Sequence, residues 1–310
     1  MIDTLVVFKS NQYGLTRDAE LLVAAMRAAG VKVDVAGISD RPIMERIRGV
    51  KRARRIIHLE RVFPQWISAA DINMLVPNQE RFPRRQIGRL RNIDLILAKT
   101  EEACRVFADS GEPCERLGFT SLDRFDPSVH RDWNRFLHLA GGSTLKGTED
   151  VLALWARHPE WPELVLVQKQ ENAPASAAGN VRLVTGYASD AELRRYQNGC
   201  GIHLCPSRSE GWGHNLVEGL SCGAVVLTTD APPMNEHVHA DCGVLVPTDR
   251  AEPRHMGTNH FVVIDQLEAA IRDLIAMPVE TKRDMGALAR QRYLEIDGDF
   301  QQRVADLLAS

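Results

Sequence analysis

SEGWGHNLVEGLSCGAVVLTTD, residues 209–230, is the stretch that decides the fold class of this 310-residue chain. The apolar segment GIHLCPS (201–207) leads into it, and a turn that contains glycines follows. A helix is predicted from about His214 to a stop at Cys222 and Gly223, and AVVLTTD predicts another buried strand. A strand, a helix and a strand in that order are typical of a parallel sheet covered by helices.

The same stretch predicts a ligand site. In open parallel sheets, ligands bind beyond the carboxyl ends of the strands, where loops enter helix N-termini. Gly211 and Gly213 let the backbone approach a ligand closely, and the N–H groups at the helix start favour a phosphate. Glu218, about one turn into the helix, can accept hydrogen bonds from the vicinal hydroxyls of a ribose. Glu210 faces whatever lies beyond the phosphates, so the residues predict a nucleoside-diphosphate ligand with a polar head group.

Strands and helices also alternate over the rest of the chain. In the first half, strands are predicted at 5–10, 31–38, 54–60, 72–80 and 93–100, with helices at 17–29 and 101–109. In the second half, strands are predicted at 136–142, 163–168, 181–186 and 201–207, with helices at 148–156 and 190–197. The polar stretch TSLDRFDPSVHRD (120–132) is predicted to link them. The expected fold class is α/β, with two doubly wound parallel-sheet domains, 1–128 and 129–290, and a cleft between them.

The composition adds a charge asymmetry to this picture. The chain is 44% apolar and 25% charged with a net charge of -3, yet residues 1–130 carry +4 and residues 131–310 carry -7. This difference predicts two bodies with different partners. The six cysteines form no CxxC pair and are expected to be reduced core thiols. No apolar run reaches the roughly 18 residues of a spanning helix, and MIDTLVVF (1–8) is too short for a signal segment, so a cytoplasmic location is expected.

From about residue 118 to residue 250, the chain resembles family 4 of the retaining glycosyltransferases, which have the GT-B fold of two facing Rossmann-like domains. Residues 209–230 carry the family's glutamate-x7-glutamate element, and TSLDRFDP and GGSTLKGTEDVLALW resemble its interdomain stretch and its phosphate-lysine loop. NVRLVTGYASDAELRRYQNGCGIHLCPS, AVVLTTDAPPMNEHV and GVLVP follow in the family's order. The resemblance implies transfer of a sugar from a UDP- or GDP-sugar to a hydroxyl of a glycan, glycolipid or small molecule.

The resemblance assigns roles to matching residues. Glu218 would bind the donor ribose, Glu210 would contact sugar hydroxyls near the anomeric carbon, and Lys146 would neutralise the leaving diphosphate. The donor would also meet the turn and helix start, at Gly211, Gly213, His214 and Asn215. The family usually has Gly-Arg in the lysine loop, where this chain has Gly142 and Ser143. Arg208 or Lys169 could supply the missing cation, and the alternative for each is an ordinary solvated charge.

The resemblance also implies front-face transfer, in which the leaving phosphate oxygen helps to deprotonate the acceptor, so Glu210 is not a general base. No Asp-x-Asp element suited to a divalent ion is present, and we expect neither a metal nor another cofactor. The last helix, 291–310, has Phe300, Val304, Leu307 and Leu308 on one side. By analogy with GT-B proteins, it is expected to cross back to the first domain.

The first domain offers weaker candidates for the site. Gly14, in the loop NQYGLT (11–16), could let backbone N–H groups face the donor phosphates or could only shape a tight turn. His58, at the end of a predicted strand, is a candidate for the donor sugar because family members often use a histidine there; a structural histidine is the alternative. Asn78 and Glu80, polar residues at the end of another predicted strand, are alternative candidates for the role of this histidine.

Two basic runs, 45–55 and 81–91, leave the partner of this domain open. With Ile43, Ile47 and Val50 near a helical stripe, the first run could lie on an anionic bilayer and reach a lipid-linked acceptor. The two runs could instead hold a nucleic-acid backbone, or could be a solvated face. Two further hypotheses therefore accompany the leading one: a glycosyltransferase that modifies nucleic acid, and a catalytically silent protein that binds sugar nucleotides or glycans.

Overall fold

A computed structural model describes residues 2–10, 14–186 and 188–309. The chain divides into two compact units, which are described separately. The first unit comprises Met1–Thr120, Pro253–Gly257 and Ile296–Ser310, and the second comprises Ser121–Glu252 and Thr258–Glu295. The first unit thus ends before the predicted boundary at residue 128, and it takes in two later segments.

The first unit is built on a six-stranded parallel sheet in the order β2-β1-β3-β4-β5-β6. Its strands are β1 (Ile2–Phe8), β2 (Val33–Gly37), β3 (Ala53–Glu60), β4 (Ile72–Pro77), β5 (Leu95–Ala98) and β6 (Cys114–Arg116). Its helices are α1 (Gly14–Ala28), α2 (Ile43–Ile47) and α3 (Glu101–Ala108), with 3-10 turns at Pro64–Ala69, Gln79–Arg81 and Arg84–Asn92. The central strands are buried on both faces, which explains their continuous apolar runs.

Helix α1 shows how the sequence pattern produces this packing. Leu15, Ala19, Leu22 and Met26 follow the helical period and are all buried, and the helix packs on β1, β2 and β3. Gly30 closes the segment with a positive φ of 85°, a conformation that costs little only for glycine. The predicted helix and the strands around it are confirmed here.

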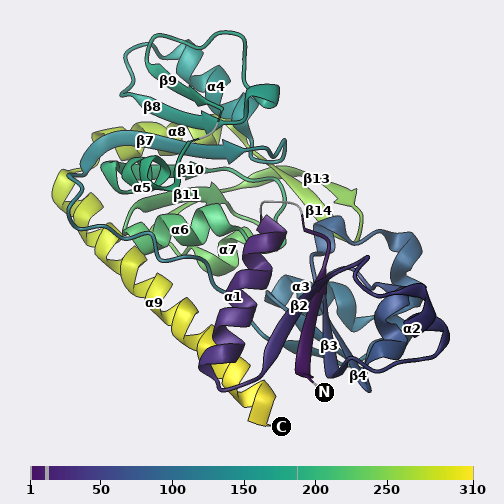
Figure 1. The fold of residues 1–310 in the computed structure, drawn as a ribbon. Coiled ribbons are helices and arrows are strands. Elements are labelled where there is room, and N and C mark those ends of the chain that lie inside the picture. The colour runs from purple at the N-terminus through teal and green to yellow at the C-terminus, as the bar shows by residue number, and fades with distance from the viewer. Residues whose placement is uncertain (1, 11–13, 187, 310) are drawn as a thin grey trace. The chain divides into compact units, whose positions relative to one another are not determined.

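The second unit repeats this architecture with the strand order β12-β11-β10-β7-β8-β9, again with parallel pairing throughout (Figure 1). Its strands are β7 (Asp132–Gly141), β8 (Leu164–Gln168), β9 (Val181–Thr185), β10 (Cys200–Cys205), β11 (Val225–Thr229) and β12 (Gly243–Val246). Its helices are α4 (Thr148–Arg157), α5 (Asp190–Gly199), α6 (His214–Cys222), α7 (Met234–His237) and α8 (Ile264–Ala276), with a 3-10 turn at Gln170–Asn172.

Alternate residues of the central strand β7 build two separate cores. Phe136 packs with Trp155 of α4 and Ile271 of α8, whereas its neighbour Leu137 packs with side chains of α5. Because successive side chains of a strand point to opposite faces, both faces of the sheet are covered by helices. The prediction of doubly wound parallel sheets is confirmed.

Two elements depart from the predicted pattern. A two-stranded hairpin, β13 (Thr248–Arg254) and β14 (Gly257–Val262), follows β12, and its residues 253–257 group with the first unit. Helix α9 runs from Val279 to Ala309, well before the predicted start at 291, and its residues from Ile296 onward group with the first unit. Phe300 and Val304 are buried there, as their apolar stripe predicts. No helix in the described ranges is both long and apolar enough to cross a bilayer.

The six cysteines are free thiols, as expected. Burial raises the pKa of Cys200, Cys205 and Cys222 to about 12, so these three side chains behave as small apolar core residues.

Three buried histidines also belong to the sheets: His58 on β3, His138 on β7 and His203 on β10. Burial lowers the pKa of each to about 4. His138 donates from Nδ1 to the carbonyl of Leu204 at 2.7 Å, and its Nε2 lies 2.9 Å from the Thr148 hydroxyl, which fixes the neutral tautomer.

These histidines predict how stability depends on pH. Each binds a proton near pH 6.5 in the unfolded chain but only near pH 4 when folded, so the free energy of unfolding should fall as the pH is lowered through that window. The slope should be up to about 1.4 kcal/mol per pH unit for each histidine. Denaturant titrations between pH 7.5 and 4.5 measure it. His58→Asn should reduce the slope and the exposed His130→Asn should not; equal slopes in both variants would contradict the prediction.

Candidate functional site

The loop between β10 and α6 builds the centre of the site. Gly213 precedes the helix with φ 100°, and a Cβ at that position would lie 3.0 Å from Leu216 Cδ1, so glycine is required there. Trp212 is held by its indole N–H, which donates to Ser121 Oγ at 3.1 Å, and by its carbonyl, which accepts from His237 Nε2 at 2.7 Å. The N–H groups at the start of α6 are therefore presented by a fixed turn.

Lys146 enters this turn from the loop after β7. Its Nζ lies 2.5 Å from Glu210 Oε1 and 2.7 Å from Asn215 Oδ1. Both charged side chains are largely shielded from solvent, with exposed fractions of 14% for Lys146 and 13% for Glu210. Within the described residues these are the acceptors found for the ammonium group, which has three N–H donors. The structure thus brings together three residues that the sequence places in two distant segments.

The two loops are also joined through their backbones. Arg208 N donates to the carbonyl of Leu145 at 2.8 Å, directly before Lys146. Gly147, directly after it, has φ 67°, and a Cβ there would lie 2.5 Å from the carbonyl oxygen of Pro206. This close approach fixes where Lys146 leaves the backbone.

Glu218 lies on α6, one turn beyond Asn215, and only 2% of it is exposed. Its Oε2 accepts a hydrogen bond from Gln197 Nε2 at 2.8 Å. His214, at the first position of the same helix, contacts Ser121 Oγ through Nδ1 at 2.8 Å. Sequence reasoning missed Ser121 and Gln197, because the first lies in a stretch interpreted as a linker and the second on an ordinary polar helix.

The two candidates for the missing loop cation differ in their surroundings. Arg208 lies 2.7 Å from Glu149 and 3.1 Å from Asp150, with its guanidinium over the ring of Phe261. Two carboxylates therefore already balance its charge. Lys169 lies against the loop itself, since a Cβ on Gly142 would meet its Cδ at 3.0 Å. Ser143 caps the loop by accepting from Leu145 N at 3.2 Å.

The candidate residues of the first unit, His58 and Gly14, differ in their burial and contacts. His58 is fully buried; its Nε2 lies 3.3 Å from Asn73 Oδ1 and its Nδ1 accepts from Phe63 N at 3.2 Å, a geometry that favours the structural alternative. Gly14 is the first residue of α1, and residues 11–13 of the predicted loop lie outside the described residues.

Asn78 accepts from Lys99 Nζ at 3.0 Å, and the same ammonium is paired with Asp18 at 2.5 Å. Glu80 is 8% exposed. The buried Lys99 and Asp18 pair was not anticipated, because the two residues are distant in the sequence and carry no motif.

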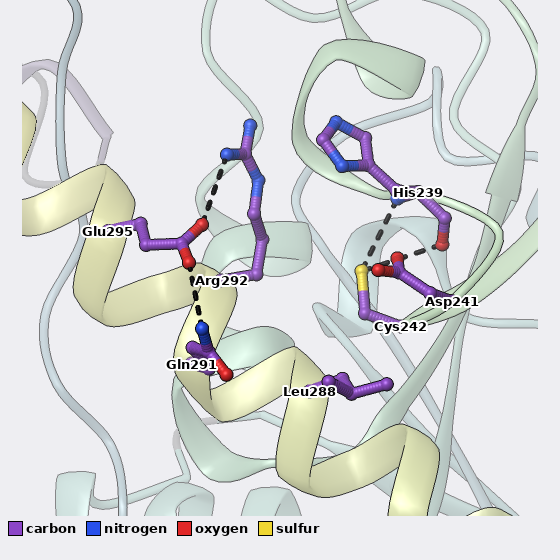
Figure 2. Close-up of a pocket in the computed structure, with 7 residues that line it drawn as sticks. All are labelled: His239, Asp241, Cys242, Leu288, Gln291, Arg292 and Glu295. Atoms are coloured by element: carbon purple, nitrogen blue, oxygen red, sulfur yellow. Dashed lines mark hydrogen bonds and ion pairs between the residues drawn. The ribbon is translucent and has the colours of Figure 1, made fainter.

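A small pocket of the second unit is separate from these residues. It is lined by the turn at 239–242 and by α9, through His239, Asp241, Cys242, Leu288, Gln291, Arg292 and Glu295 (Figure 2). Its cavity volume of about 80 Å³ suits a few water molecules. None of its lining residues belongs to the predicted site. Across the described ranges, no group of three or more His, Cys, Asp or Glu side chains is placed to hold a metal ion.

Part of the chain matches a known protein family in sequence. Residues 167–292 match the family model of glycosyl transferases group 1. No protein of curated function matches the chain in sequence.

Several solved structures share the fold. Sucrose-phosphate synthase from Thermosynechococcus elongatus is 13% identical with a TM-score of 0.73, and 99% of this chain and 98% of that chain are covered. Anabaena Alr3699/HepE in complex with UDP and glucose is 13% identical with a TM-score of 0.72 and full coverage of both chains. The pneumococcal O-GlcNAc transferase GtfA, in complex with UDP and GlcNAc, is 15% identical with a TM-score of 0.63 over 86% of this chain, which spans 59% of that chain's length. The predicted GT-B fold, with two Rossmann-like domains, is confirmed.

Gly147 provides a test of the loop geometry. Gly147→Ala adds a Cβ that collides with the backbone at Pro206 and strains a positive φ, so it should lower the free energy of unfolding by about 2 to 4 kcal/mol. Denaturant titration measures the change. The exposed Gly179, which has nothing within 4 Å of an added Cβ, is the matched control, and Gly179→Ala should leave stability nearly unchanged. Equal stability of the two variants would show that the loop is not fixed at Gly147.

Proposed function

We propose that the chain is a retaining, metal-independent glycosyltransferase of family 4 that uses a nucleotide-sugar donor. The observation that carries this proposal is the convergence of Lys146, Glu210 and Asn215 at the N-terminus of α6. A cation, a carboxylate and a helix start within hydrogen-bond distance of one another suit a ligand with a diphosphate next to a polyhydroxylated group. The match of residues 167–292 to glycosyl transferases group 1 supports it.

Each residue has one task in this proposal. Backbone N–H groups at the start of α6, at Gly213 and His214, donate hydrogen bonds to the distal phosphate. Glu218 accepts hydrogen bonds from the ribose. Lys146 stabilises the charge that develops on the leaving diphosphate, a contribution that grows as the glycosidic bond breaks. The acceptor oxygen bonds to the anomeric carbon on the face that the phosphate oxygen leaves, and the acceptor proton passes to that phosphate oxygen.

Donor binding should change the partner of Lys146. In the structure, the carboxylate of Glu210 lies 2.5 Å from Lys146 Nζ and balances its charge. A diphosphate carries more negative charge than one carboxylate and competes for the same ammonium. The exchange turns Glu210 toward the hydroxyls of the donor sugar, where it orients the sugar and does not act as a base.

A second cation next to the diphosphate would come from Lys169. Arg208 lies 2.7 Å from Glu149 and 3.1 Å from Asp150, whereas Lys169 lies at a longer 3.7 Å from Glu171 and packs along Gly142 in the lysine loop. The donor is proposed to be a UDP-sugar or a GDP-sugar. UDP is the first to test, because both Anabaena Alr3699/HepE and the pneumococcal O-GlcNAc transferase are solved with UDP.

Activity measurements test the proposal. With a panel of UDP-, GDP- and ADP-sugars, Lys146→Met and Glu210→Gln should each lower donor turnover by about 10² to 10³ fold, because the first loses the charge that stabilises the leaving diphosphate and the second loses the carboxylate that orients the donor sugar. Hydrolysis of the donor followed by NMR gives the rate, the anomeric configuration of the released sugar should be retained, and EDTA should leave the rate unchanged.

The control for this experiment is Glu252→Gln, which removes an exposed carboxylate paired with Arg250. It should turn over the donor at the rate of the unmodified chain. Nucleotide binding without turnover of any sugar in the panel would favour the alternative of a catalytically silent binding protein.

For the acceptor side, we propose a lipid-linked acceptor reached from an anionic membrane surface. Helix α2 buries none of its residues, and Ile43, Met44 and Ile47 are 66%, 52% and 73% exposed. Arg41 lies beneath this segment and donates to Gln65 O at 2.6 Å and to Val50 O at 3.1 Å. Arg41 therefore fills the space beneath α2 with its hydrogen bonds, and the apolar side chains of α2 stay exposed to solvent.

Basic residues surround this apolar face. Arg46, Arg48, Lys51 and Arg52 are exposed within the next few positions. Arg52 is paired with Glu45 and Lys51 with Asp71, while no ion pair is found for Arg46 or Arg48 among the described residues. Apolar side chains next to basic residues, two of them without an ion pair among the described residues, fit an anionic bilayer better than a nucleic acid, which offers phosphates but no apolar layer. The free cysteines favour a reducing compartment, so the proposed surface is the cytoplasmic face of a membrane.

Vesicle binding tests the membrane surface. The double change Ile43→Glu with Ile47→Glu should reduce sedimentation with vesicles containing phosphatidylglycerol by about tenfold or more, because it replaces two inserted apolar groups with charges that anionic lipid repels. Leu294→Glu, at a leucine of α9 with 53% exposure, is the matched control and should bind as the unmodified chain does. Retention of duplex DNA at moderate salt would favour the nucleic-acid alternative if it is lost in Arg84→Gln with Arg85→Gln but kept in Ile43→Glu with Ile47→Glu.

A further inference from the structure

Glu218 is connected to the linker between the two sheets by a short chain of buried side chains. Gln197, on α5, donates from Nε2 to Glu218 Oε2 at 2.8 Å and accepts at Oε1 from Arg124 Nε, also at 2.8 Å. The exposed fractions are 4% for Arg124, 1% for Gln197 and 2% for Glu218. Water therefore does not compete for these hydrogen bonds, and each is worth more than it would be at the surface.

The chemistry of the two neighbours fixes the orientation of the amide. A guanidinium can only donate hydrogen bonds, and an ionised carboxylate can only accept them. A flipped Gln197 would place its NH₂ group against Arg124 and its oxygen against Glu218, which replaces two favourable contacts with two repulsive ones. The amide of Gln197 is thus a directed donor toward one oxygen of Glu218.

Arg124 is itself fixed at both ends. Its guanidinium is paired with Asp190 Oδ1 at 2.8 Å and donates to the Asp190 carbonyl at 3.1 Å. Its backbone N–H donates to Ser221 Oγ at 3.0 Å, and that hydroxyl donates to the carbonyl of Glu218 at 2.8 Å. One linker residue therefore holds both the side chain and the main chain at Glu218.

We propose that Gln197 is a positioning residue that orients the carboxylate of Glu218 toward the ribose, and that it thereby sets the preference for ribonucleotides over deoxyribonucleotides. This inference rests on the proposed function, in which Glu218 accepts hydrogen bonds from the ribose hydroxyls. A carboxylate that is free to rotate loses alignment with two adjacent hydroxyls, and the resulting loss of affinity falls only on ligands that carry them.

Binding of paired nucleotides tests the proposal. Isothermal titration calorimetry with UDP and with 2′,3′-dideoxy-UDP, or with GDP and 2′,3′-dideoxy-GDP if the chain prefers guanine, gives the discrimination between ribose and dideoxyribose. The unmodified chain should prefer the ribonucleotide by about tenfold or more. Gln197→Met keeps the size of the side chain but removes both hydrogen bonds, and it should bring that preference close to one while affinity for the dideoxynucleotide stays the same.

Two variants complete the design. Asp190→Asn, at an exposed side chain, weakens the ion pair with Arg124 and leaves the buried amide of Gln197 in place. It should reduce the preference for the ribonucleotide by a smaller factor. This variant also tests the proposal if Gln197→Met does not fold. Gln291→Leu, at an exposed glutamine of α9, is the matched control and should keep the full preference.

The possible outcomes separate the inference from the function on which it rests. A chain that binds the ribonucleotide and the dideoxynucleotide equally well before any substitution would overturn the role of Glu218. A chain that discriminates, and keeps doing so in Gln197→Met and Asp190→Asn, would overturn the positioning role alone. Equal weakening of both nucleotides in Gln197→Met would assign Gln197 a structural role and would also overturn the proposal.

Discussion

The arrangement of the candidate site depends on the ion pair between Lys146 and Glu210. The two residues come from loops that follow different strands of one parallel sheet, and a parallel sheet brings such loops to the same edge. Bringing two mostly shielded charges together is unfavourable unless their geometry is held, because desolvation opposes the attraction. Gly147, pressed against the Pro206 carbonyl, and the hydrogen bond from Arg208 N to Leu145 O supply that geometry. The glycines therefore matter because they let the backbones approach and set where the charges meet.

Much of the fold could be predicted from the sequence, and the reason is physical. Strands such as β8 and β11 are buried at every position, so they appear as uninterrupted apolar runs, and helices such as α1 carry a clear stripe. The hairpin β13 and β14 could not be predicted in the same way, because most of β13 is exposed and its composition is that of a polar loop. The true start of α9 was missed for a related reason: its segment 279–290 mixes polar and apolar residues without a clear apolar stripe, although many of them favour a helix.

The candidate site shows a similar division. The glutamates, the glycines and the lysine could be named in advance because phosphate and hydroxyl recognition uses few residue types at regular spacings. Two of their partners could not, since Gln197 and Ser121 are ordinary polar residues whose importance comes only from what the fold places beside them. His58 illustrates the opposite case. A histidine at a strand end suggests chemistry, but hydrogen bonds on both ring nitrogens and a pKa lowered by burial make it a neutral part of the core.

The stretch 120–132 differs most between the sequence-based interpretation and the structure. A polar composition with a proline predicts a linker, and a linker is usually tolerant of substitution because its backbone is exposed. Here Arg124 is buried, Asp126 N donates to Asn198 Oδ1 at 2.9 Å, and Asp123 is paired with Arg290 at 2.6 Å. Nearly every turn of this segment is thus bound to the second unit, which explains why that unit begins at Ser121. A segment bound this firmly transmits any displacement of its backbone to the helices that carry Gln197 and Glu218. Its polar residues are therefore constrained by the geometry of the candidate site as well as by solubility.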